Sequence, residues 1–239
     1  MAVDSLYVEP ARPTERLDWG ALEFHDVFKI YAAGPVETVA LRGLDLRVEP
    51  GEFVAVLGPS GCGKSTMLAL AAGLDEPSAG DVRAFGRSLG RLSEPELAAY
   101  RSREIALIFQ SENLWPALGA RENVALALRL AGHEDAGAAA EDALRTLGLG
   151  DRLANRPAAL SGGEQQRVAI AAAAARRARL TLADEPTGEL DRASEGLVLT
   201  ALRSLRADYG STVVVVTHSE AVAGSADRVI ELRDGAVLA

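Results

Sequence analysis

The chain has a single cysteine, Cys62, among its 239 residues, so it can form no disulfide bond within itself. It also lacks a secretory start, because its opening residues, "MAVDSLYVEPARPTERLDWG", contain neither a basic segment nor an apolar stretch. Together these two absences predict a reducing environment. We therefore expect a cytoplasmic protein.

Long apolar runs and an excess of basic residues are absent as well. The longest apolar candidate, "VAIAAAAARRARLTLA", is interrupted by arginines and falls short of the roughly 20 residues that span a membrane. Lysine and arginine number 25 against 34 acidic residues, which gives a net charge of −9. Because nucleic acids are bound by clustered basic side chains, this balance argues against a nucleic-acid partner. Any membrane role is expected to come through another protein.

Strand-like and helical patterns alternate along most of the chain. Residues 1–20 show no periodicity and are predicted to be a flexible leader, followed by one domain over 21–239. Strands are predicted in "LEFHDVFKIY", "LRGLDLRVEPG", "EFVAVLG", "LTLADEP", "TVVVVTH" and "RVIELRDG". Buried strands alternating with helices predict an α/β fold with a parallel sheet. The mostly helical stretch from about 93 to 178, interrupted by "IALIFQ", is predicted to be an inserted subdomain.

The segment "GPSGCGKS" matches the phosphate-loop pattern G-x-x-x-x-G-K-[ST] and lies between a predicted strand and a predicted helix. Its glycines allow a curved backbone whose N–H groups face a phosphate, Lys64 is expected to reach the β- and γ-phosphates, and Ser65 to bind Mg²⁺. An ordinary glycine-rich turn is the competing interpretation, which the flanking strand and helix disfavour. The predicted nucleotide-binding residues of this loop are Gly58, Pro59, Ser60, Gly61, Cys62, Gly63, Lys64, Ser65 and Thr66.

Polar side chains end three further apolar strands. Asp184 is expected to hold the Mg²⁺ shell and Glu185 to position or deprotonate the attacking water. His218 and Gln110 end two other strands and should reach the same edge of a parallel sheet, His218 near a γ-phosphate and Gln110 near Mg²⁺ or its water. Each has a plainer alternative, a solvated turn for the acidic pair and a structural role for the histidine.

A second helix start of unusual composition lies in "ALSGGEQQRVAI", where a serine and two glycines precede a helical run. Small residues at a helix N-terminus leave backbone N–H groups free to bind an anion. The same residues could simply cap the helix. From the residues alone, both interpretations stay open.

These motifs in this order, with "GELD" between "LADEP" and His218, resemble the nucleotide-binding domain of ABC ATPases over about residues 22–238. The resemblance implies a P-loop NTPase with a RecA-like core, an antiparallel β edge and an inserted α-helical subdomain, which binds ATP with Mg²⁺ and hydrolyses it. "YRSREIALIFQSENLWPALGARENVALAL" and "LADEPTGELD" are similar to the stand-alone ATPases of the lipoprotein-release, macrolide-export and cell-division group. These ATPases act with an integral membrane permease or a mechanotransmission subunit, at the inner face of the membrane.

The resemblance also implies roles for individual residues. Tyr31 corresponds to the aromatic that stacks on adenine, with Phe28 as the competing candidate. Gln110 corresponds to the glutamine that senses Mg²⁺ and faces the membrane partner, and His218 to the γ-phosphate switch. In the family, "LSGGEQQRVAI" corresponds to the signature segment, and two copies pack head to tail, so that each ATP lies between the phosphate loop of one copy and the signature segment of the other. The residues expected to act across this interface are Ser161, Gly162, Gly163 and Glu164, with Asp191 as a dimer contact.

Two positions depart from the group's pattern: Ala172 replaces a common arginine, and Glu189 replaces a common asparagine near the dimer seam. We expect the membrane partner to dock near Gln110 and "SENLWPALGARENV". Two other functions compete with transport. One is an ATP-gated regulatory module of a membrane-anchored cell-wall hydrolase complex, and the other is a soluble protein acting on DNA or ribosomes, which the acidic balance disfavours.

Overall fold

The computed structural model describes residues 19–33 and 36–238. Residues 1–18, which make up most of the predicted leader, lie outside the described residues. Trp19 and Gly20 are the first described residues, and the Gly20 N–H donates a hydrogen bond to the Glu23 carboxylate over 3.0 Å. Among the described helices, none is long and apolar enough to cross a bilayer.

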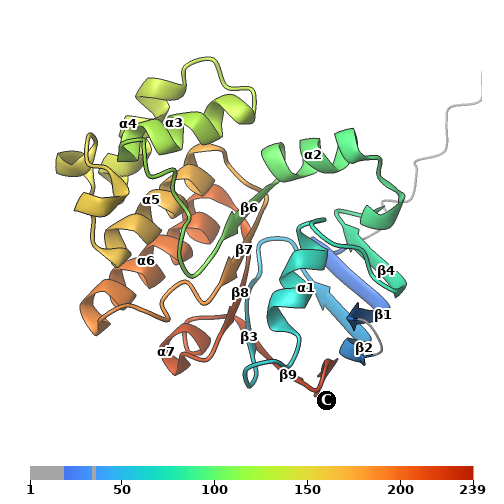
Figure 1. Cartoon of the computed structure of the whole chain (residues 1–239). Coiled ribbons are helices and arrows are strands. Elements are labelled where there is room, and N and C mark those ends of the chain that lie inside the picture. The colour runs from blue at the N-terminus through green and yellow to red at the C-terminus, as the bar shows by residue number, and fades with distance from the viewer. Residues whose placement is uncertain (1–18, 34–35, 239) are drawn as a thin grey trace, which may run out of the picture.

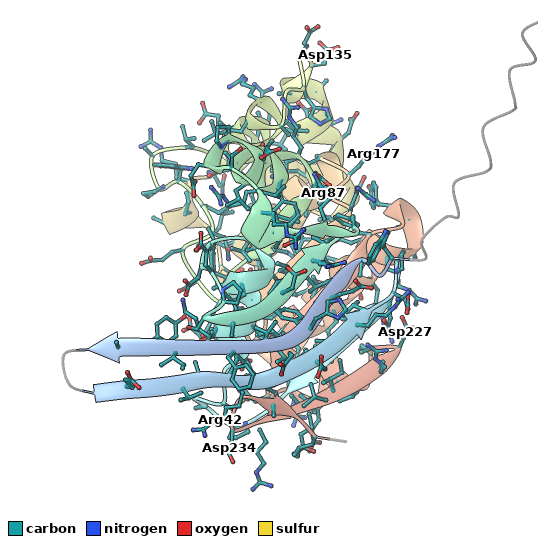
Figure 2. All side chains as sticks on the ribbon, turned by 90° about the vertical axis from the view of Figure 1, so that its right-hand side faces the viewer. Arg42, Arg87, Asp135, Arg177, Asp227 and Asp234 are labelled. Atoms are coloured by element: carbon teal, nitrogen blue, oxygen red, sulfur yellow. The ribbon has the colours of Figure 1, made fainter. Side chains whose placement is uncertain are left out.

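A four-stranded antiparallel sheet forms one side of the molecule (Figure 1). Its order is β2-β1-β4-β5, with β1 (Leu22–Ala33), β2 (Val36–Val48), β4 (Ala79–Ala84) and β5 (Arg87–Ser88). Figure 2 shows β1 and β2 running side by side across this face. β4 and β5 are not predicted by the sequence pattern, because "AGDVRA" has little apolar alternation and is held by its pairing with β1.

The second sheet has the order β10-β9-β3-β8-β7-β6. Its strands from β9 to β6 are parallel, and β10 pairs antiparallel with β9. The bounds are β3 (Phe53–Leu57), β6 (Ile105–Ile108), β7 (Leu180–Asp184), β8 (Thr212–Thr217), β9 (Arg228–Arg233) and β10 (Ala236–Val237). The predicted parallel sheet is therefore confirmed.

The central strands are apolar on both faces because both faces are covered. Val214 and Val216 of β8 join a core with the antiparallel sheet, α1 (Lys64–Ala71) and α2 (Glu94–Arg103). Val213 and Val215 pack on the opposite face, against α5 (Gly162–Ala175), α6 (Arg192–Tyr209) and α7 (Glu220–Ala223). This two-sided burial explains the unbroken "TVVVV" run.

A third hydrophobic cluster joins α5 to α3 (Ala120–Leu130) and α4 (Ala136–Thr146), the helical group at the upper left of Figure 1. The stretch predicted as an insertion runs from about 93 to 178. Its first part, α2 and β6, packs on the core of the sheet and not with the helical group. There β6 pairs with β7, and the buried Tyr100 hydroxyl of α2 donates a hydrogen bond to the Ala71 carbonyl over 2.7 Å. Because α5 belongs to two clusters, it connects the helical group to the sheet.

Candidate functional site

The phosphate loop connects the carboxyl end of β3 to the N-terminus of α1, as predicted, and two of its glycines admit no side chain. A Cβ on Gly58 would lie 2.2 Å from the Leu232 carbonyl oxygen. Gly63 has φ 105°, and a Cβ there would lie 2.5 Å from the Ala40 carbonyl oxygen. Both contacts are with backbone, which cannot rotate away. The backbone path of this loop therefore requires glycine at both positions.

Lys64, the first residue of α1, turns its side chain back across the loop. Its ammonium donates hydrogen bonds to the carbonyl oxygens of Gly58 and Pro59, over 2.7 and 3.0 Å. Only 9% of the residue is exposed. Cys62 contributes backbone to the loop while its side chain is buried in the core. The loop thus combines a nearly buried cation with a curved backbone, which suits a phosphate.

The polar residues that end the parallel strands meet beside this loop. They line one cleft of about 690 Å³. Its lining residues are Ser60, Lys64, Ser65, Phe109, Gln110, Ser111, Glu112, Asp184, Glu185 and His218. Phe109, Ser111 and Glu112 were not expected in this site, because they follow β6 in a stretch without a phosphate-binding pattern. The remaining members come from segments that are far apart in the sequence.

Glu185 and His218 contact each other across this cleft. The His218 Nδ1 lies 3.0 Å from a Glu185 carboxylate oxygen, and the His218 backbone N–H donates to the same oxygen over 3.3 Å. Glu185 also has a φ of 45°, in the left-handed region that costs a residue with a side chain about 1–3 kcal/mol. Residues in this conformation cluster at active sites and ligand-binding positions.

Oxygen ligands suited to Mg²⁺ line the same cleft: the Ser65 hydroxyl, the Gln110 amide oxygen and the Asp184 carboxylate. The Gln110 Nε2 donates to the Glu189 carboxylate over 3.1 Å. Within the described part of the chain, no three His, Cys, Asp or Glu side chains lie together as a metal cluster. The donor set therefore fits a Mg²⁺ ion that takes its further ligands from water and nucleotide phosphates.

Tyr31 lies near the C-terminal end of β1, within reach of Thr66 in the phosphate loop. Its hydroxyl donates to Asp75 over 2.9 Å, and the Lys29 ammonium lies 4.8 Å from the centre of its ring. Burial raises the pKa of Tyr31, a hydrogen bond with Thr66 lowers it, and Asp75 raises it further. The competing candidate, Phe28, packs close to Gly43 instead. No local pattern predicts that Lys29 and Asp75 lie beside Tyr31, since only the fold brings them together.

The residues from Ser161 to Glu164 form the N-terminus of α5. The Ser161 hydroxyl accepts from the Glu164 N–H over 3.2 Å, and the Ser161 N–H donates to the Glu164 carboxylate over 2.8 Å. This is a capping box. The backbone hydrogen bond from Ser161 lowers the pKa of Glu164, and Arg152 lowers it further from 2.9 Å. These capping residues are not among those that line the cleft described above.

The two signature glycines differ in what surrounds them. A Cβ on Gly163 would lie 2.8 Å from the Ser194 Cβ, so this glycine allows α5 and α6 to approach closely. A Cβ on Gly162 would meet only the end of the Leu190 side chain, at 3.1 Å. Gly162 is exposed, whereas Gly163 is buried. Close helix packing at Gly163 was not anticipated from the sequence.

Asp191 caps α6. One carboxylate oxygen accepts from the N–H groups of Ala193 and Ser194, over 2.9 and 3.0 Å, and the other accepts from the Ser194 hydroxyl. Hydrogen bonds from Ser194 lower the pKa of Asp191. Ala172, one of the two departures from the group's pattern, is partly buried against the helical cluster. Neither position lines the cleft.

The fold and the cleft define a P-loop nucleotide-binding protein with an added helical group. The family model for ABC transporters matches residues 41–188, which is more than half of the chain. The chain belongs to this family, as an ATP-binding domain that hydrolyses ATP. The predicted family, fold class and enzyme type are therefore confirmed.

Similar proteins fall into two groups by length. The chain is 45% identical to the macrolide export ATP-binding/permease protein MacB of Marinobacter nauticus, over 90% of this chain and 33% of that protein. It is 45% identical to the lipoprotein-releasing system ATP-binding protein LolD of Anaeromyxobacter dehalogenans, over 91% of this chain and 92% of that protein. The chain thus spans about a third of the MacB relatives and nearly all of the LolD relative.

The structure resembles that of the ATP-binding cassette MJ0796, with a TM-score of 0.84 and 40% sequence identity. The match covers 91% of this chain and 97% of that one. The MJ0796 structure is described as dimeric, in a post-hydrolysis state bound to ADP and Pi.

Proposed function

We propose that two copies of this chain pack head to tail and hydrolyse Mg-ATP to drive an integral membrane partner. The observation that carries this proposal is the separation of two candidate half-sites on one chain. Lys64, Asp184, Glu185 and His218 line one cleft, whereas the capping residues at Ser161 lie outside it. A second copy would bring its own Ser161 to the nucleotide, as the dimeric state of the MJ0796 cassette supports.

In this proposal the loop N–H groups and Lys64 bind the phosphates. Ser65, Gln110 and Asp184 hold Mg²⁺, which when bound neutralises phosphate charge during transfer. Glu185 takes a proton from the attacking water, and His218 donates a hydrogen bond toward the γ-phosphate. The 3.0 Å contact between these two side chains supports their joint action at one phosphate.

Adenine would stack on Tyr31, and Lys29 and Asp75 would hold that ring in place. Across the dimer, the Ser161 hydroxyl and the N–H groups of Gly162 and Gly163 would meet the γ-phosphate, because a helix N-terminus carries a positive partial charge. Glu164 would hold the cap in shape. Asp191, which already caps α6, would contact the second copy.

An exposed apolar surface supports docking of the membrane partner beside Gln110. The Trp115 residue is 65% exposed and Phe109 is 46% exposed. With Pro116 and Pro157, Trp115 lines a groove of about 760 Å³. A large exposed tryptophan next to a groove marks an interaction surface more often than an isolated apolar residue does. We infer a cytoplasmic subunit held at the inner face of the membrane by this partner.

A photo-crosslinking residue placed at Trp115 in the native host tests the partner. We expect the crosslinked product to contain an integral membrane protein. A partner with a substrate cavity would indicate transport, and a partner with a periplasmic lever and no cavity would indicate mechanotransmission. Crosslinks to soluble proteins alone would contradict the proposed role.

A further inference from the structure

Gln166 lies within α5, and its side chain leaves that helix to contact the segment after β6. The residue is only 3% exposed. Its Nε2 donates hydrogen bonds to two consecutive backbone carbonyls, that of Phe109 over 2.9 Å and that of Gln110 over 2.6 Å. The amide nitrogen of this buried side chain therefore binds the backbone at both Phe109 and Gln110.

Asn113 completes this network. Its Nδ2 donates to the Gln166 Oε1 over 3.1 Å and to the Phe109 carbonyl over 2.8 Å. Its Oδ1 accepts from the Phe109 N–H over 2.7 Å. A network in which a buried side-chain amide is fully paired in this way holds the backbone in one arrangement. The segment that carries Gln110 is thus fixed by two amide side chains.

The helix that supplies Gln166 begins at Ser161, whose hydroxyl caps it. One rigid helix therefore carries both Ser161 and the amide that holds Gln110. Gln166 holds the backbone carbonyl of Gln110 and so fixes the position from which the Gln110 side chain extends. Losing an outer support of a metal ligand commonly weakens metal binding 10- to 100-fold.

We propose that Gln166 is a positioning residue that orients Gln110 toward the metal and links it to the helix of the opposite half-site. This inference rests on the proposed metal role of Gln110 and the proposed contact of Ser161 with the second copy's ATP. Movement of Gln110 when Mg-nucleotide binds would pass directly to the N-terminus of α5. Each ATP would then influence the half-site that the same chain offers to its neighbour.

Two substitutions remove this link in different ways. Gln166→Glu keeps the length and the acceptor for Asn113 but places carboxylate oxygens against two carbonyl oxygens. Gln166→Met keeps the approximate shape without any polar atom. The neighbouring Gln165 offers a matched control, because its Nε2 also donates to two carbonyls, those of Pro157 and Leu160, over 3.1 and 3.2 Å.

The test measures Mn²⁺ affinity by electron paramagnetic resonance, on protein held with adenylyl imidodiphosphate at a concentration where it is monomeric. Gln166→Glu is expected to weaken Mn²⁺ binding about tenfold. Gln165→Glu is expected to leave it unchanged, and Gln110→Ala to weaken it. Circular dichroism melting checks that each variant is folded. If Gln166→Glu does not fold, the same Mn²⁺ affinity is measured on Gln166→Met.

A second measurement tests the link to the other half-site. In a Glu185→Gln background, Gln166→Glu is expected to raise the protein concentration at which ATP produces half-dimerisation. If Gln110→Ala weakens Mn²⁺ binding while both Gln166 variants match the parent, the inference is overturned and the proposed function stands. If Gln110→Ala itself changes nothing, the metal role of Gln110 is wrong and the inference falls with it.

Discussion

Lys64 is the only lysine or arginine among the described residues that line the cleft, so replacing it removes that permanent positive charge. Removing one partner of a buried, hydrogen-bonded charge pair costs about 2–5 kcal/mol of binding. We expect the lower part of that range, because the ammonium must first give up its two hydrogen bonds to the carbonyls of Gly58 and Pro59. At about 1.4 kcal/mol per tenfold change, Lys64→Ala should weaken ATP binding roughly 30- to 100-fold.

Titration with a fluorescent ATP analogue measures this loss directly. Lys64→Met should lose nearly as much affinity as Lys64→Ala, since it keeps the packing of the stem and lacks only the charge. Arg42→Ala is the control for long-range charge, because Arg42 is exposed and lies outside the cleft (Figure 2). It should bind ATP as the parent does. Unchanged affinity in both Lys64 variants would refute the assignment of the phosphate loop.

Three further predictions concern hydrolysis and stability. Glu185→Gln should lower kcat by about 10²- to 10⁴-fold in a phosphate-release assay and keep ATP binding, and retained turnover would exclude Glu185 as the base. Gly163→Ala should lower the free energy of unfolding by about 1–3 kcal/mol in urea, because its Cβ would lie 2.8 Å from the Ser194 Cβ. The control Gly162→Ala should lower the free energy of unfolding by less than Gly163→Ala does. Equal decreases in the two variants would contradict the packing argument. Asp191→Ala should destabilise the chain more at pH 7 than at pH 3, since a carboxylate with a lowered pKa stabilises the fold above its unfolded pKa and loses that effect as pH falls through its folded pKa. Equal losses at both pH values would show that its charge contributes nothing.

Much of the site could be predicted because its residues end apolar strands. Asp184, His218 and Gln110 each lie at the end of such a run. A parallel sheet brings the carboxyl ends of these strands to one edge. The glycine pattern and Lys64 identify the loop on their own. Local patterns of this kind need no knowledge of tertiary contacts.

The remaining features depend on contacts that no local pattern encodes. β4 is held by pairing with β1, although its own sequence has little strand character. Gly163 is required by Ser194, thirty-one positions later in the chain. Gln166 appears in the sequence as part of a family signature, and only the structure shows its side chain bound to the backbone at Gln110.

The central claim is that each ATP lies between the phosphate loop of one copy and Ser161 of another. Light scattering coupled to size exclusion, with and without ATP, tests it on Glu185→Gln and on the double variant Glu185→Gln/Ser161→Arg. The account predicts that Glu185→Gln dimerises only with ATP, and that the double variant binds ATP but stays monomeric. If the double variant dimerises on ATP as readily as its parent, Ser161 is only a helix cap and the two-copy site is wrong.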